Sequence, residues 1–253
     1  MPAAVLKSAI KQYCSAALGG GAVKFFGGEP LLRFGLVRTG IGMLEAAGYR
    51  GRAEVGTNGL LLDAAKLRYF SARPWVQVNI NSSVSVSRRF AALPNLIWNL
   101  LLPERDPLSS LGVLKRVIAA SRGRPPRVNV LPAYYREWTP AALAKLARAL
   151  RHIRELADSG AVVIENASRE GPVPLFNPGT TVDTDGRCYH SNLVLAARDP
   201  GQAAQMLAGG LEALGAGSGR RPDYSGMAKK LFGAKAVAGG MAADRLAERI
   251  LLG

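Results

Sequence analysis

The sequence predicts an α/β fold with a parallel sheet, and two observations support that prediction. Short apolar segments alternate with helical segments about every thirty residues, which is the length of a strand–helix–strand unit. Glycine or polar residues follow several apolar segments, as is usual where parallel strands end at a shared ligand face. An open, doubly wound sheet of the flavodoxin type remains the structural alternative. The strands that we expect cover residues 22–27, 52–57, 75–81, 95–102 and 127–131.

The first expected strand ends in a turn that is suited to ligand binding. Its apolar run stops after Phe26, where Gly27 and Gly28 follow. Pro30 fits the first turn of the next helix, because its missing N–H would have no partner there. Since glycine has no Cβ, the backbone of this turn can lie directly against a ligand.

Two strand ends together resemble those of the radical SAM superfamily. Residues 25–32 read Phe-x-Gly-Gly-Glu-Pro-Leu-Leu and residues 57–62 read Thr-Asn-Gly-x-Leu-Leu, the forms that end the second and third barrel strands of that family. The resemblance covers residues 4–192 and implies a partial (β/α)6 TIM-like barrel that lacks its first strand. It also implies S-adenosyl-L-methionine and a [4Fe-4S] cluster as cofactors, an electron donor for the intact form, and radical chemistry on an unknown substrate.

The cysteine triplet that holds the cluster in this family, Cys-x3-Cys-x2-Cys, is absent from the chain. Only Cys14 and Cys188 are present, and two separate thiolates cannot hold such a cluster. We therefore expect no metal site and no activity of this chain alone. We interpret the missing triplet as the result of a start that was assigned too late. The alternative is a degenerate, non-catalytic barrel that serves as a binding or partner protein, and the DNA upstream of Met1 distinguishes the two.

The resemblance implies cofactor contacts at positions of this chain, although it assigns no catalytic residue. The turn at 27–29 would receive the methionine ammonium group, since a cation needs acceptors. Asn79 and Asn81 would lie near the ribose, and Arg89, rather than Arg88, would clamp the carboxylate. A plain strand-to-helix turn and a solvated basic pair are the alternatives for the first and last of these roles. The implied cofactor-binding residues are Gly27, Gly28, Glu29, Pro30, Thr57, Asn58, Asn79, Asn81, Arg89 and Leu131.

Beyond the barrel, the sequence predicts a smaller extension. Asp185-Gly186 is typical of a hairpin turn, and the phrase around it resembles the strand pair of SPASM-type extensions. Cys188 is the one cysteine there, so we expect it to be structural. The expected domains are residues 1–160 (partial barrel), 161–198 (strand and hairpin extension) and 199–253 (a helical, basic region that we expect to be peripheral). Tyr134, Tyr135 and Trp138 either line the substrate opening or belong to the core.

Composition narrows the possible partners and location. The chain has 33 Lys and Arg against 18 Asp and Glu, a net charge of +15. Because no long basic run or aromatic nucleic-acid motif accompanies this charge, we favour a solvated basic surface over a nucleic-acid site. No segment is apolar enough to predict a membrane span, and two distant cysteines do not form a disulfide scaffold. We therefore expect a cytoplasmic protein without a membrane partner.

Overall fold

The structure is a computed structural model that describes residues 1–15, 21–168, 179–197, 199–214 and 223–253. The chain divides into two compact units, which are described separately here. The first unit contains Met1–Ala53 and Phe176–Gly233, and the second contains Glu54–Leu175 and Ala234–Gly253. The three domains expected from the sequence group the residues differently and stay a prediction, because compactness alone does not define a domain boundary.

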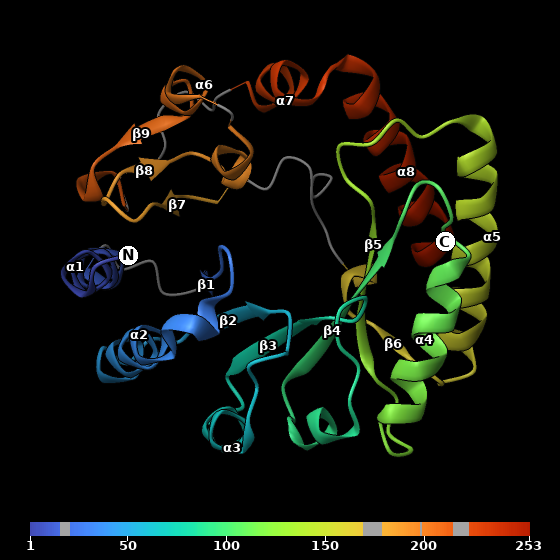
Figure 1. The fold of residues 1–253 in the computed structure, drawn as a ribbon, viewed down its shortest axis with the longest axis horizontal. Coiled ribbons are helices and arrows are strands. Elements are labelled where there is room, and N and C mark those ends of the chain that lie inside the picture. Colours follow the sequence, from blue (N-terminus) through green and yellow to red (C-terminus); the bar gives the residue numbers. More distant parts are fainter. Residues whose placement is uncertain (16–20, 169–178, 198, 215–222) are drawn as a thin grey trace. The chain divides into compact units, whose positions relative to one another are not determined.

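The main sheet has six strands, and their order follows the sequence from β1 to β6 (Figure 1). The pairs β3–β4, β4–β5 and β5–β6 are parallel, which confirms the predicted α/β fold with a parallel sheet. Because the strand order never reverses, the sheet has no topological switch point, and the doubly wound alternative does not fit it. The strands are Ala22–Phe25 (β1), Arg52–Thr57 (β2), Val76–Asn81 (β3), Leu96–Leu102 (β4), Arg127–Pro132 (β5) and Val163–Ile164 (β6).

The last strand of this sheet was not expected to belong to it. The sequence places residues 161–164 beyond the barrel, whereas β6 pairs with β5, with Arg127 beside Val163 and Val128 beside Ile164. A strand of this length carries too little alternation to be assigned from sequence. Closure of the barrel and the missing first strand stay predictions.

In the second unit, one face of the sheet is apolar. Side chains alternate between the two faces along a strand. Val78, Ile80 and Trp98 lie on the apolar face, and none of them is more than 2% exposed. Helix α4 packs on β4, and Figure 1 shows α4 and α5 side by side next to this part of the sheet. The helices of the unit are α3 (Ala64–Ser71), α4 (Ser109–Ala120), α5 (Pro140–Asp158) and α8 (Ala234–Leu252), with the short 3-10 helices η2 (Arg88–Ala92) and η3 (Glu165–Ser168).

The long helix α5 has a capping residue and a proline at its start. Oγ1 of Thr139 accepts a hydrogen bond from the amide of Ala142 at 3.1 Å, so that Thr139 caps the helix, and Pro140 occupies its first turn. Its buried stripe includes Leu146, Leu150 and Ile153, each fully shielded from solvent.

The expectation that the end of the chain is peripheral was wrong for α8. This helix packs along α5, where Nη1 of Arg154 donates to the carbonyl oxygen of Leu251 at 2.7 Å. Val237 and Ala243 are fully buried. The buried face of α8 consists mainly of alanine and glycine, so it approaches closely without presenting the large apolar stripe that predicts a core helix.

The first unit contains a pair of packed helices and a small antiparallel sheet. Helices α1 (Ala3–Ser15) and α2 (Phe34–Ala46) pack together, and 3-10 helix η1 (Pro30–Arg33) leads into α2. The predicted hairpin forms between β7 (Thr181–Val182) and β8 (Cys188–Tyr189), with Gly186 at a φ of 90° in its turn. The remaining elements of the unit are β9 (Leu207–Gly209), the 3-10 helices η5 (Asn192–Ala196) and η6 (Leu211–Ala213), and helices α6 (Pro200–Ala204) and α7 (Tyr224–Phe232).

Candidate functional site

The turn after β1 exposes its backbone. Gly27 has a φ of 140°, a conformation that favours glycine. A Cβ placed on Gly27 or on Gly28 would meet no atom within 4 Å, so the space beside both residues is open. Oε1 of Glu29 accepts a hydrogen bond from the amide of Leu31 at 3.1 Å and caps η1, which Pro30 begins. The structure thus places the predicted residues 27–30 together in one strand-to-helix turn of the first unit.

In the second unit, the turn after β2 is held by its own side chains. Oγ1 of Thr57 accepts a hydrogen bond from the amide of Gly59 at 3.1 Å, and Oδ1 of Asn58 accepts one from the amide of Leu60 at 2.9 Å. Gly59 has a φ of 81°, and a Cβ there would lie 3.2 Å from the Ile80 side chain. Local turn geometry therefore accounts for these residue types, and their role in cofactor binding stays a prediction.

Three asparagines line up across neighbouring strands of the second unit. The register places Asn81 of β3 beside Asn99 of β4, and Asn99 beside Asn129 of β5. Residues in register in a parallel sheet present their side chains to the same face. Nδ2 of Asn129 donates to Oδ1 of Asn99 at 3.0 Å, while Oδ1 of Asn81 accepts from Oγ of Ser83 at 2.7 Å. We call Asn81, Asn99 and Asn129 the asparagine row.

A second polar group, Gln77, Asn79 and Glu54, lies on the same face. Gln77 and Asn79 are four and two positions before Asn81 on β3, and side chains two positions apart on a strand point to the same face. Nε2 of Gln77 donates to Oδ1 of Asn79 at 2.7 Å, and Nδ2 of Asn79 donates to Oε2 of Glu54 at 3.4 Å. Glu54 is 5% exposed and Gln77 is 9% exposed. This face can thus offer amide donors and carbonyl or carboxylate acceptors to a polar ligand.

Sequence reasoning identified only part of this polar face. It selected Asn79 and Asn81, and it missed Glu54, Asn99 and Asn129. The available signal was the isolated polar residue inside each apolar strand, which the alternation of β-strands assigns to one face.

The polar face ends in aliphatic residues on one side and an ion pair on the other. Leu131, the predicted neighbour of the adenine, lies beside Leu101 in register, two positions after Asn129. At the opposite end of β5, Arg127 binds Glu165 through two hydrogen bonds, Nε to Oε1 at 2.5 Å and Nη2 to Oε2 at 2.8 Å. The hydrogen bonds that Arg127 donates to the carboxylate of Glu165 raise the pKa of Arg127, so this guanidinium keeps its charge.

Arg89 does not lie with the asparagine row. Its guanidinium carbon is 5.1 Å from the centre of the ring of Phe90, the next residue in η2. Phe90 is buried and packs against Trp98 with ring centres 5.9 Å apart. Because Trp98 lies on the face of β4 opposite to Asn99, η2 packs on the apolar face. The proposed carboxylate clamp at Arg89 stays a prediction.

The aromatic loop after β5 has both a core member and a partly buried pair. Trp138 is 7% exposed, and its Nε1 donates to the carbonyl oxygen of Ala133 at 3.0 Å, so it belongs to the core. Tyr134 and Tyr135 lie with ring centres 6.3 Å apart. Burial, followed by the charge of Asp244, raises the pKa of Tyr135 to about 12, which keeps this hydroxyl protonated and able to donate.

The two cysteines do not suit an iron–sulfur cluster. Cys188 is fully buried and packs against Ala9 and Leu214, whereas Cys14 is partly exposed on α1. Burial raises the pKa of both thiols, and a protonated thiol is a poor metal ligand. In the part of the chain that the structure describes, no group of three or more His, Cys, Asp or Glu could hold a metal ion. The residues present therefore do not fit the cluster that the resemblance implies.

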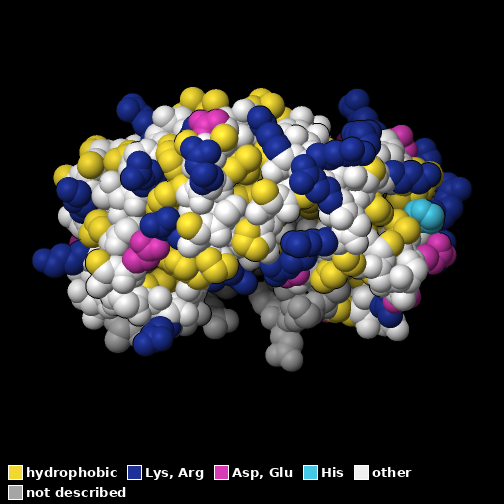
Figure 2. Space-filling model, turned by 90° about the horizontal axis from the view of Figure 1, so that it is seen from below, with side chains coloured by type: hydrophobic (Ala, Val, Ile, Leu, Met, Phe, Trp, Pro, Cys, Tyr) yellow, Lys and Arg dark blue, Asp and Glu magenta, His cyan; other side chains and the backbone are white. Residues whose placement is uncertain are grey.

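The basic residues are spread over the surface. On the face shown in Figure 2, Lys and Arg side chains stand in separate groups with hydrophobic and neutral side chains between them. Part of this charge is paired locally, as in the 2.7 Å contact between Nε of Arg154 and Oδ1 of Asp158. Among the helices in the described ranges, none combines the length and the apolar character needed to cross a bilayer.

A parallel sheet in sequence order, flanked by helices, is consistent with a TIM-like fold. No family model and no curated protein matches the sequence. The chain is similar to anSMEcpe, an anaerobic sulfatase-maturating radical SAM enzyme. With AdoMet and a Kp18Cys peptide bound, that structure matches with a TM-score of 0.58 and 14% identity over 98% of this chain and 75% of that chain. Its form with AdoMet alone matches with a TM-score of 0.60 and 14% identity over 94% of this chain and 74% of that chain. At this identity the likeness shows the fold.

Proposed function

We propose that this chain is a radical SAM protein with a SPASM-like extension at its 181–189 hairpin. In its intact form the protein would cleave S-adenosylmethionine reductively to start radical chemistry on an unknown substrate, whereas this chain alone is inactive. The observation that carries the proposal is the open backbone at Gly27 and Gly28, in a fold that matches structures with AdoMet bound.

Several of the predicted residues have roles that their chemistry suits. The carbonyl groups of Gly27 and Gly28 and the carboxylate of Glu29 would accept hydrogen bonds from the methionine ammonium group. In the second unit, Asn79 and Asn81 would bind the ribose hydroxyls. The aliphatic side chain of Leu131 would contact the adenine. A [4Fe-4S] cluster would supply the reducing electron, and its ligands are not among the cysteines of this chain.

The first test is the replacement of Gly28 by alanine. Its φ is not in the left-handed region and the space beside it is open, so the fold should accept the methyl group. A ligand that lies against the backbone should clash with this methyl group. Overpacking costs about 1–3 kcal/mol, which weakens binding roughly fivefold to 150-fold. Saturation-transfer NMR with S-adenosylmethionine, which detects weak ligands, measures the dissociation constant for the wild type and for Gly28→Ala.

Two further variants separate the possible causes. Gly42→Ala in α2, where a Cβ would also meet nothing within 4 Å, should bind like the wild type. Glu29→Gln keeps an oxygen that can accept the hydrogen bond from Leu31 but removes the charge, and it should also weaken binding. Equal affinity in the wild type, Gly28→Ala and Glu29→Gln would remove this turn from the binding site.

A second prediction concerns the cluster. After anaerobic incubation with iron and sulfide, this chain should hold no stoichiometric [4Fe-4S] cluster, since its two thiols are far apart in sequence and have raised pKa values. Iron and sulfide analysis together with the visible absorption spectrum measures the cluster. A visible band that persists after both Cys14 and Cys188 are replaced by serine would reveal a different set of ligands.

A further inference from the structure

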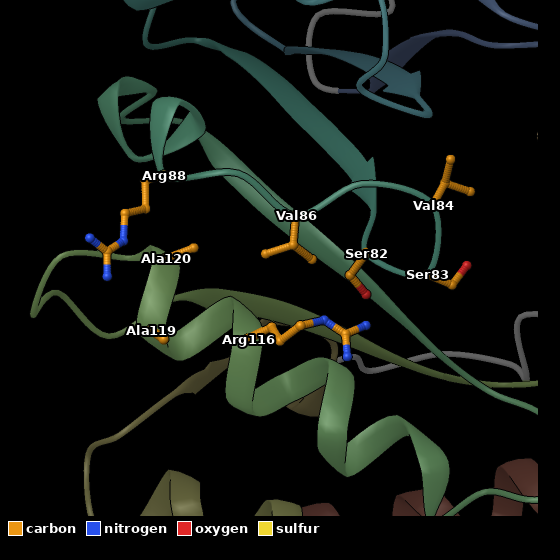
Figure 3. Close-up of a pocket in the computed structure, with 8 residues that line it drawn as sticks. All are labelled: Ser82, Ser83, Val84, Val86, Arg88, Arg116, Ala119 and Ala120. Atoms are coloured by element: carbon orange, nitrogen blue, oxygen red, sulfur yellow. The ribbon is translucent and has the colours of Figure 1, made fainter.

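The connection between β3 and β4 differs from the other crossovers of the second unit. The chain reaches β3, β5 and β6 through α3, α4 and α5 respectively, whereas residues 82–95 contain only the 3-10 helix η2. A crossover between parallel strands usually contains an α-helix that packs on the sheet. Here residues 82–87 connect β3 to η2 without an α-helix. A groove of about 340 Å³ lies between this segment and α4 (Figure 3).

The groove has a basic residue toward each end and an apolar middle. Figure 3 shows Arg116 extending from α4 toward Ser82, while Arg88 extends from the start of η2 on the side of Ala120 away from Val86. Val86 points into the space between them. Among the described residues, none that lines the groove is acidic; these lining residues are Ser82, Ser83, Val84, Val86, Arg88, Arg116, Ala119 and Ala120.

The serine hydroxyls add little attraction for an anion. Oγ of Ser82 donates to the carbonyl oxygen of Asn99 at 2.8 Å, and Oγ of Ser83 donates to Oδ1 of Asn81 at 2.7 Å. Each hydroxyl proton is therefore already engaged. The recognition that the groove can offer comes from the two guanidinium groups and from the small apolar side chains between them.

The exposure of the walls favours an extended occupant. Arg88, Arg116 and Ala119 are exposed, and Val84 is 51% exposed. Small-molecule pockets enclose most of their ligand, whereas a groove of exposed residues suits a strand or helix of another chain. The basic ends also complement carboxylates spaced along a peptide. We propose that this groove is a docking site for an acidic peptide segment of a partner protein, in which acidic residues alternate with small apolar ones.

The probe is a fluorescein-labelled dodecapeptide of alternating glutamate and alanine, with fluorescence anisotropy as the measurement. The double variant Arg88→Glu/Arg116→Glu should weaken binding about tenfold, because it replaces two guanidinium groups that can pair with the carboxylates of the peptide by groups of like charge. The control Lys115→Glu/Arg148→Glu makes the same change in net charge at exposed positions of α4 and α5 that do not line the groove. It should change the affinity less than twofold.

Three outcomes would overturn the proposal. Equal weakening in the control would show that the peptide follows the overall positive charge of the chain. Equal binding of a glutamine–alanine peptide would show that carboxylates are not recognised. Displacement of the peptide by succinate as efficiently as by unlabelled peptide would show a site for small dianions. Circular dichroism of both double variants, compared with the wild type, ensures that folded proteins are compared.

Discussion

Replacing Gly239 with alanine should lower the free energy of unfolding by about 3 kcal/mol, since overpacking against rigid atoms has costs of this order. A Cβ at this position would lie 2.6 Å from the amide nitrogen of Trp138 and 2.9 Å from the carbonyl oxygen of Arg136. These are backbone atoms, and they cannot turn away as a flexible side chain can. Trp138 is itself fixed, because its indole is buried and hydrogen-bonded to Ala133.

Urea unfolding followed by circular dichroism measures this effect. The matched control is Gly112→Ala in α4, where a Cβ would meet no atom within 4 Å. Alanine is favoured over glycine in a helix, so the control should gain roughly 0.5–1 kcal/mol. If Gly239→Ala were as stable as the wild type, α8 would not approach the β5–α5 loop as the structure has it.

Helix α8 also illustrates what sequence patterns miss. Helix α5 has a clear sequence pattern, because leucine and isoleucine recur on one of its faces and Thr139 and Pro140 mark its start. The contact face of α8 holds Gly240, Ala243 and Ala247, which give no strong apolar periodicity. Close packing through small residues depends on the shape of the partner surface, which a local pattern does not contain.

The candidate site was predicted in part for a similar reason. The residues at strand ends could be assigned from sequence, because glycines and turn residues mark where each strand stops. Asn99 and Asn129 were missed, since their significance depends on the register that places them beside Asn81. Arg89 was selected through the family resemblance, from its position a few residues after a strand, and that position does not show which face of the sheet a 3-10 helix covers.

The turn residues show another limit. Thr57 and Asn58 belong to a motif of a cofactor-binding family, yet both side chains also hold the local turn. The same residue types serve either purpose, because a short polar side chain can accept a hydrogen bond from the backbone or from a ligand. Only substitutions that preserve the turn can separate the two roles.

Replacing Trp98 with alanine should destabilise the second unit by about 3–5 kcal/mol, the usual effect of truncating a buried aromatic residue. Trp98 is 2% exposed, lies beside Ile80 in register and packs against Phe90. Leu101 on the same strand belongs to the other face and is 40% exposed. Leu101→Ala is thus the control, and it should change the free energy of unfolding by less than about 1 kcal/mol.

Urea unfolding of the two variants tests whether only one face of the sheet is packed in the core. The proposed function depends on this, because its ligand would bind the other face. A ligand can reach the asparagine row only if that face is not already part of the core, and Leu101 lies two positions after Asn99 on it. A small effect at Leu101 together with a large one at Trp98 agrees with a face that is open to a ligand. If Leu101→Ala were as destabilising as Trp98→Ala, the polar face would be packed in the native protein, and its asparagines would serve the fold rather than bind S-adenosylmethionine.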